Sequence, residues 1–111
     1  MAHLPHADRA VLDLHKIEDY CLSPAHPRGR HKARVFREVL GLVRSDAEWL
    51  RQALLDGLAE QEAAELANDS YGTRWRVDIP VRRQNSGAVV KTVWIIRSGE
   101  REPRFVTCWV L

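Results

Sequence analysis

The sequence has no long apolar run, only two cysteines, and no C-x-x-C, H-x-x-x-H or H-E-x-x-H motif. A membrane-spanning helix needs about 20 apolar residues, and no stretch approaches that length. The first residues, Met1–His6, also lack the charged and apolar blocks of a signal peptide. We therefore expect a soluble, cytoplasmic protein without membrane association.

The two cysteines, Cys21 and Cys108, are far apart and belong to no C-x-x-C motif. The histidines form neither an H-x-x-x-H nor an H-E-x-x-H motif, so the sequence indicates no metal site and no cofactor. We expect two reduced, buried thiols. Internal repeats and low-complexity segments are also lacking, and 111 residues suit one small domain.

Charge is present but unevenly distributed. The net formal charge is +2, yet it is −2 for residues 1–22, +5 for 23–44, −6 for 45–69 and +5 for 70–111. If the fold brings the two basic segments together, they form one positive face. A polyanion is the natural partner for such a face.

Apolar residues recur at helical spacing in the first part of the chain. After a loose start at 1–9, we expect a mainly helical region at 10–69, with helices at about 15–22, 31–42 and 45–66. The last helix begins with the S-x-x-E form of a capping box, and its buried side includes Trp49 and Leu66.

From residue 70 onward the apolar residues alternate with polar ones, which is typical of strands. Strict alternation in the last strand, 104–111, puts Phe105, Thr107 and Trp109 on one face. The expected fold class is α+β, with N-terminal helices packed on one face of a small antiparallel β-sheet. We expect this sheet, at 70–111, to be a meander of three main strands, and the sequence leaves a fourth short strand open. The whole forms a single domain over 1–111.

The segment Ser23–Phe36 contains most of the candidate functional residues, because a loop with two prolines and a glycine runs into a helix there. Helix N-termini favour anions, so cations in this place indicate phosphate binding. A histidine is the commonest acid or base in proteins near neutral pH. The candidates from this segment are His26, His31, Lys32, Arg28, Arg30 and Arg34.

The last strand supplies two further candidates. Arg104 would orient a phosphate, and Thr107 is either a buried hydrogen-bonding group or a hydroxyl presented at the sheet surface. Most of the tryptophans are expected in the core, and either Trp75 or Trp109 is a candidate for stacking on a base.

Residues 19–36 resemble the signature D-Y-x-L-x-P-x-H-P-x-G-x-x-K-A-x-x-F of a bacterial family, the domain of unknown function 6883. The stretches 71–73, 92–100 and 103–107 match the same pattern. The resemblance covers nearly the whole chain and implies family membership. It implies no activity, because the family has no settled biochemical role.

A more remote resemblance is to the ribonuclease toxins grouped with barnase, the EndoU nucleases, the colicin ribonucleases and RelE. These proteins pair N-terminal helices with an antiparallel sheet and bring basic residues or histidines to the sheet face. The resemblance implies one cleft between the helical part and the sheet, formed by His26, Arg30, His31, Lys32, Arg104 and Thr107.

We therefore expect a small toxin-type, metal-independent endoribonuclease that acts on RNA by transesterification, as in toxin–antitoxin or polymorphic toxin systems. In this reaction His26 or His31 serves as acid or base, and Lys32 and Arg30 stabilise the charge of the phosphorane. An acidic antitoxin or immunity protein would be its partner.

Two alternatives stay open. The domain could be a non-catalytic binding module that uses its basic face to hold nucleic acid or an acidic protein, with His26 and Lys32 as structural residues. It could also be an enzyme for a small anionic metabolite, which a deep pocket would favour over an open basic groove. An exposed edge at residues 104–111 would allow a homodimer.

Overall fold

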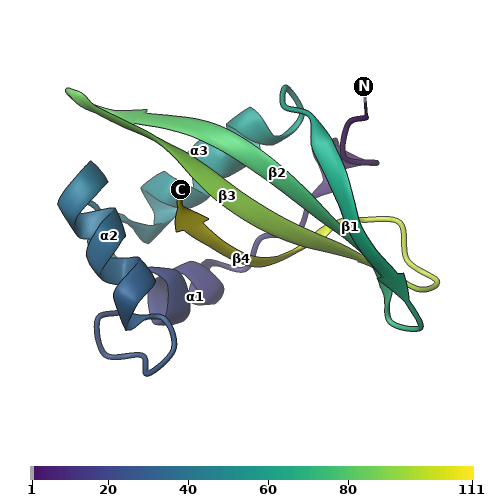
Figure 1. Ribbon diagram of the computed structural model, residues 1–111, viewed down its shortest axis with the longest axis horizontal. Helices are drawn as coiled ribbons and strands as arrows, with labels where there is room; N and C mark the ends of the chain where they lie inside the picture. The colour runs from purple at the N-terminus through teal and green to yellow at the C-terminus, as the bar shows by residue number, and fades with distance from the viewer. Residues whose placement is uncertain (1) are drawn as a thin grey trace.

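The computed structural model describes residues 2–111. α1 (Leu14–Lys16) continues as a π-helical turn, Ile17–Cys21, and is followed by α2 (Arg30–Leu40) and α3 (Ala47–Leu58). The strands are β1 (Ala63–Asp69), β2 (Gly72–Arg83), β3 (Ser86–Arg97) and β4 (Arg104–Val110). They form one antiparallel sheet in the order β1-β2-β3-β4 (Figure 1). The expected α+β class, with N-terminal helices against an antiparallel meander, is confirmed.

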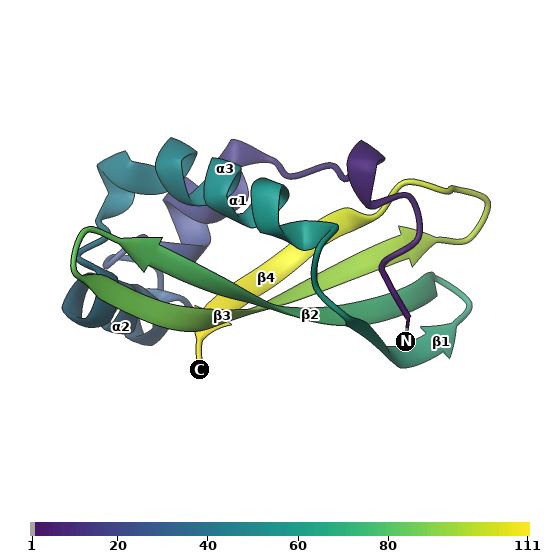
Figure 2. The ribbon, with the colours of Figure 1, turned by 90° about the horizontal axis from the view of Figure 1, so that it is seen from above.

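The core lies between α3 and the sheet, and Figure 2 shows this helix running along one side of the strands. The buried side of α3 has leucines at a spacing of four residues, and Leu50, Leu54 and Leu58 are fully buried. They join a cluster of alternate strand residues that includes Val77, Ile79, Val90 and Trp94. Each large side chain buried in this way stabilises the fold by about 1.5–3 kcal/mol.

The helix that we expected to reach Leu66 ends at Leu58. Ala63–Asp69 instead form β1, an edge strand paired with β2, with a bulge between Glu65 and Ala67. Its residues after Ala63 are exposed, and Leu66 is 50% exposed. This part of the helix prediction was wrong. Alanine and glutamate favour helices locally, but pairing with β2 outweighs that weak preference.

The N-terminus of α3 also differs from the expectation. A 3₁₀ turn, Arg44–Asp46, precedes the helix, and Asp46, the N-cap residue of α3, forms no side-chain hydrogen bond to it. The Asp46 carboxylate instead caps the 3₁₀ turn, since its Oδ2 accepts a hydrogen bond from the Val43 N–H at 2.9 Å. Trp49 is 37% exposed, and the Arg83 guanidinium carbon lies 5.2 Å from its ring centroid. This tryptophan therefore lies at the border of the core.

A bulge at Val106 changes which residues of β4 share a face. Trp94 lies opposite Phe105, whereas Val93 lies opposite Thr107. The extra residue puts Phe105 on the buried face and leaves Thr107 and Trp109 on the other, so the expectation from strict alternation was wrong. We term this second face, which also carries Lys91, Val93 and Arg104, the outer face.

The N-terminal segment covers part of the free edge of β4. Val11 forms a parallel bridge with Arg104; its N–H donates to Pro103 O at 2.8 Å, and its oxygen accepts from the Phe105 N–H at 2.9 Å. Lys16 Nζ donates to Phe105 O at 2.9 Å. The expected exposed edge is therefore covered at this end of β4.

The start of the chain is more ordered than the loose segment that we expected at 1–9. Residue 1 lies outside the described residues, but the oxygen of Ala2 accepts a hydrogen bond from the Ala63 N–H at 2.8 Å. Leu4 is buried in the core. Within residues 2–111, every helix falls short of the length and apolar character of a bilayer crossing.

Candidate nucleic-acid interface

The loop before α2 is held in place by His26 and Gly29. His26 Nδ1 accepts hydrogen bonds from the N–H groups of Arg28 and Gly29, both at 3.1 Å, so the proton of the neutral ring is on Nε2. The His26 ring packs edge-on against Tyr20, with 4.6 Å between centroids. Gly29 packs against the carbonyl group of Tyr20, where a Cβ atom would overlap the oxygen.

α2 separates the basic residues of this segment into two groups. Arg30, Arg34 and Arg37 recur at intervals of three and four residues and therefore share one face of the helix. Lys32 is on the opposite side, next to the sheet, where it contacts Trp109. The segment therefore contributes to two different surfaces.

Lys32 and Lys91 both lie over the ring of Trp109. The distance from Nζ to the ring centroid is 4.4 Å for Lys32 and 4.5 Å for Lys91, and Lys32 Nζ is also 5.4 Å from the centroid of Tyr20. In residues 2–111, neither ammonium group has a carboxylate within 4.0 Å. Asp78 lies opposite Lys91 in the β2–β3 ladder, but its carboxylate is paired with Arg76. Cation–π attraction therefore holds both ammonium groups at one indole ring. We term Lys32, Lys91 and Trp109 the tryptophan platform.

Two buried thiols lie near Lys32. Cys21 and Cys108 are free and fully buried, as expected from the sequence. The pKa of Cys21 is lowered chiefly by the Cys108 thiol, and the positive charge of Lys32 contributes to the shift. Burial raises the pKa of Cys108 well above its ordinary value. Cys108 therefore stays protonated at neutral pH.

The two candidates on β4 have different surroundings. Thr107 Oγ1 is buried and has no hydrogen-bond partner of ordinary geometry in residues 2–111, although its hydroxyl lies near enough to Cys21 to lower the pKa of that thiol. Arg104 forms a two-bond ion pair with Glu100, with Nη2–Oε2 at 2.9 Å and Nε–Oε1 at 3.4 Å. Lys32 and Thr107 thus share the neighbourhood of Cys21, whereas Arg104 is engaged elsewhere.

Ion pairs neutralise other cations of the sheet. Arg76 donates to both carboxylate oxygens of Asp78, at 2.9 and 3.1 Å, and Arg74 Nη1 donates to Asp69 Oδ2 at 2.8 Å. The hydrogen bonds to Asp78 raise the pKa of Arg76, and the pKa of Asp69 is lowered chiefly by the Tyr71 N–H and next by Arg74. The free positive charge of the outer face is therefore smaller than the sequence count suggests, and Lys91 stands out.

The two tryptophans that we considered for base stacking lie on different faces. Trp75 is opposite Trp94 in the β2–β3 ladder and packs against the core, with its Nε1 atom buried. Trp109 is opposite Lys91 on the outer face and is half-buried. Of the two, Trp109 is the one that lies on the outer face beside lysine side chains.

A cleft of about 670 Å³ lies along the arginine face of α2. Its floor is apolar and includes Leu22, Ala33 and Leu42, all of which are buried. Its rim is cationic, and none of the residues lining it is acidic. We term this cleft the arginine cleft; the rim residues are Arg30, His31, Arg34, Arg37 and Arg44.

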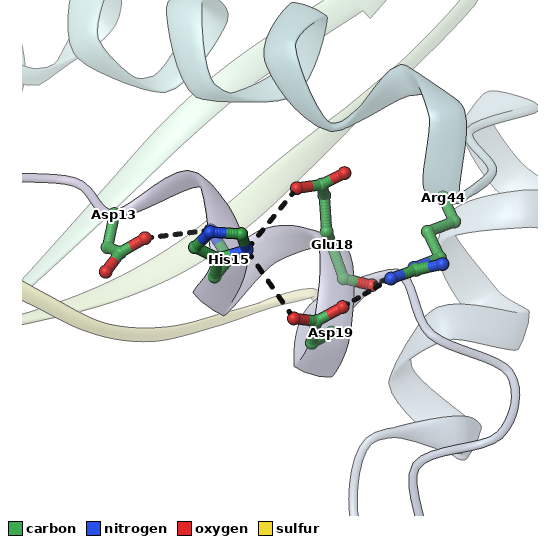
Figure 3. A network of polar contacts seen from close by, with 5 residues as sticks. All are labelled: Asp13, His15, Glu18, Asp19 and Arg44. Carbon is green, nitrogen blue, oxygen red and sulfur yellow. Dashed lines mark hydrogen bonds and ion pairs between the residues drawn. The ribbon is translucent and has the colours of Figure 1, made fainter.

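Arg44 also belongs to the polar network around α1 (Figure 3). Its Nη2 lies 2.6 Å from Asp19 Oδ1, and the carboxylates of Glu18 and Asp19 lie 3.8 and 3.7 Å from His15 Nδ1. Asp13 caps α1 by accepting the His15 N–H at 2.9 Å. The part of the chain that the structure describes contains no group of three or more His, Cys, Asp or Glu side chains suited to a metal ion.

The fold and these two surfaces define a small α+β domain with a tryptophan platform and a cationic cleft on opposite sides of one helix. The sequence model of DUF6883, a domain of unknown function, matches residues 3–111, and the chain belongs to this family. No curated protein and no solved structure matches the chain.

Sequence reasoning found Lys32 and the arginines but missed Lys91 as a site residue. Lys91 is an isolated lysine in an apolar strand, and this break in the pattern was its only signal. Its proximity to Trp109 follows from the register of β3 with β4, which the bulge at Val106 alters.

Proposed function

We propose that this domain binds single-stranded RNA, with Trp109 stacking on a base and Lys32 and Lys91 binding the adjacent phosphates. The observation that carries the proposal is the position of two ammonium groups, 4.4 and 4.5 Å from the centroid of one half-buried indole ring. Neither forms an ion pair within residues 2–111, and Asp78, which lies opposite Lys91 in the β2–β3 ladder, is paired with Arg76. An aromatic ring beside cations that follow the backbone is the usual arrangement for binding single strands.

The electrostatics of the platform favour a polyanion. The two ammonium groups repel each other, and phosphates would neutralise both at once. Lysine side chains are flexible, so an ammonium group leaves the ring when a base stacks there and then binds a phosphate. Bases in a duplex are covered by their neighbours, which is why the proposed ligand is single-stranded.

A second candidate function is cleavage of the bound RNA by transesterification without a metal ion. One observation favours it, since His26 and Lys32 lie against the same Tyr20 ring, next to the platform. In this reaction the Nε2–H group of His26, which forms no hydrogen bond within residues 2–111, donates to an oxygen of the reacting phosphate, and Lys32 stabilises the negative charge of the phosphorane. His31 lines the arginine cleft instead.

Binding is tested by fluorescence anisotropy with a labelled single-stranded RNA dodecamer over a series of salt concentrations. We expect Lys32→Gln and Lys91→Gln to weaken binding and to reduce the salt slope by about 0.7 each, because each loses one phosphate contact. Arg101→Gln removes the same charge from an exposed residue outside both surfaces and is the matched control. No binding at low salt, or an equal effect of all three variants, would contradict the proposal.

Cleavage is tested with the same RNA in the presence of a chelator, and the products are analysed for 2′,3′-cyclic phosphate ends. We expect His26→Asn to abolish such products while leaving RNA affinity within about twofold, because the asparagine oxygen can accept the loop N–H groups. Tight binding by the wild-type protein without any cleavage would establish binding alone.

A further inference from the structure

We propose that the arginine cleft is a second binding site, for a small amphiphilic anion that has an apolar body and a carboxylate, sulfonate or phosphate head. This inference goes beyond RNA binding, since the cleft lies on the opposite side of α2 from the tryptophan platform. Its ligand differs from RNA in needing an apolar surface.

The floor of the cleft fits the apolar body. Leu22, Ala33 and Leu42 close the bottom of the cleft and are buried, whereas Pro24 and Val43 at its sides are exposed and supply apolar surface to a ligand. A volume of about 670 Å³ lies within the range of roughly 300–1,000 Å³ that is typical of small-molecule sites. Transfer of an alkyl or aromatic body from water onto this lining is favourable.

The rim fits the anionic head. Arg30 and Arg37 have no ion pair in residues 2–111, and Arg34 lies 4.0 Å from Glu38, an exposed contact that contributes little. Of the rim arginines, Arg44 has the closest acid, with Asp19 at 2.6 Å. Guanidinium groups bind carboxylates and phosphates through paired hydrogen bonds, and an anion would also relieve the repulsion between them.

A phosphate backbone alone suits the cleft poorly. RNA phosphates and riboses are hydrated, and seating them against Pro24 and Val43 would remove their water without giving apolar contacts in return. A molecule with one charged end and one apolar end satisfies the rim and the floor at the same time. Medium-chain carboxylates are the simplest molecules of this kind.

The test uses the fluorescent anion 1-anilinonaphthalene-8-sulfonate as the probe and displaces it with octanoate, butanoate or octanol. We expect octanoate to displace the probe at a concentration at least tenfold lower than butanoate, because each buried methylene adds to affinity. Octanol has the same alkyl chain without the charge and should be at least tenfold weaker than octanoate. Equal displacement by octanol and octanoate would overturn the proposal.

Substitutions inside and outside the arginine cleft test where octanoate binds. Arg34→Gln removes a cation from the rim and should weaken octanoate binding about tenfold, whereas the matched control Arg101→Gln should leave it unchanged. Amide chemical-shift changes on adding octanoate should be centred on residues 22–45. Chemical-shift changes centred elsewhere, or an equal effect of both variants, would contradict the site. So would displacement of the probe by the RNA dodecamer as effective as displacement by octanoate.

The Lys32→Gln variant keeps the two proposals separate. We expect it to bind RNA more weakly and to bind octanoate as the wild-type protein does, since Lys32 is outside the cleft. A loss of octanoate binding in this variant would contradict an independent cleft.

Discussion

At the scale of single residues, the loop before α2 depends on a glycine with an ordinary backbone conformation. Gly29 has φ −92°, which any residue adopts, so its role comes from the close approach to the Tyr20 carbonyl group. We expect Gly29→Ala to lower the free energy of unfolding by about 2 kcal/mol or more, measured by urea denaturation. Gly87→Ala is the control, because its Cβ would lie 3.8 Å from the nearest atom. Equal stability of the two variants would show that the loop can shift.

Thr92 makes a second prediction at this scale. Its buried hydroxyl donates to Val77 O at 2.6 Å and accepts from Trp94 Nε1 at 2.8 Å. Thr92→Val keeps the shape but leaves the indole N–H without an acceptor, so we expect a loss of about 1–3 kcal/mol. Thermal unfolding followed by circular dichroism measures it, with Thr73→Val as the comparison at a half-buried position. A Tm unchanged by Thr92→Val would contradict this role of the hydroxyl.

At the scale of elements, Asp46 links the turn before α3 to β2. Its carboxylate accepts from the Val43 N–H at 2.9 Å and lies 3.1 Å from Arg83, and these contacts, chiefly that with Arg83, hold its pKa below the ordinary value. A lowered folded-state pKa means that the contribution to stability is complete above the unfolded pKa, about 3.9, and is lost as the pH falls through the folded value.

We therefore expect Asp46→Asn to lower the free energy of unfolding by about 1 kcal/mol at pH 7, and the difference from wild type to disappear at pH values below the folded pKa. Urea denaturation over a pH series measures this effect. Asp8→Asn changes an exposed carboxylate at the N-terminus and should leave the profile unchanged. A difference that stays constant from pH 7 to pH 2 would exclude the ion pair as its source.

The elements also show what the sequence could predict. α2 was predictable because its apolar stripe, with Ala33, Phe36 and Leu40 buried, has a clear helical period and ends at Gly41, with φ 66°. β1 was not predictable, because its side chains beyond Ala63 are exposed and show no alternation of apolar and polar residues. It is a strand only because it pairs with β2. Periodic burial is readable in a sequence, whereas pairing of an exposed edge is not.

At the scale of the whole molecule, two surfaces replace the single cleft that the sequence suggested. Arg30 and His31 line the arginine cleft, whereas Lys32 lies over Trp109 and Arg104 is paired with Glu100. The types of residue in the basic segment were readable from the sequence. The division of these residues between two surfaces was not predictable, because it depends on the rotation of α2 about its axis and on the β3–β4 register.

The central claim, that Trp109 stacks on RNA, is tested most directly by comparing the RNA affinity of Trp109→Leu and Trp49→Leu with that of the wild-type protein. Both changes replace a partly exposed tryptophan by leucine, but only Trp109 has two lysine ammonium groups near its ring centroid. Stacking on one base is worth about 1–3 kcal/mol, so Trp109→Leu should raise the Kd for the RNA dodecamer by about tenfold or more, while Trp49→Leu should leave it within about twofold. Equal affinities of the two variants would contradict the claim.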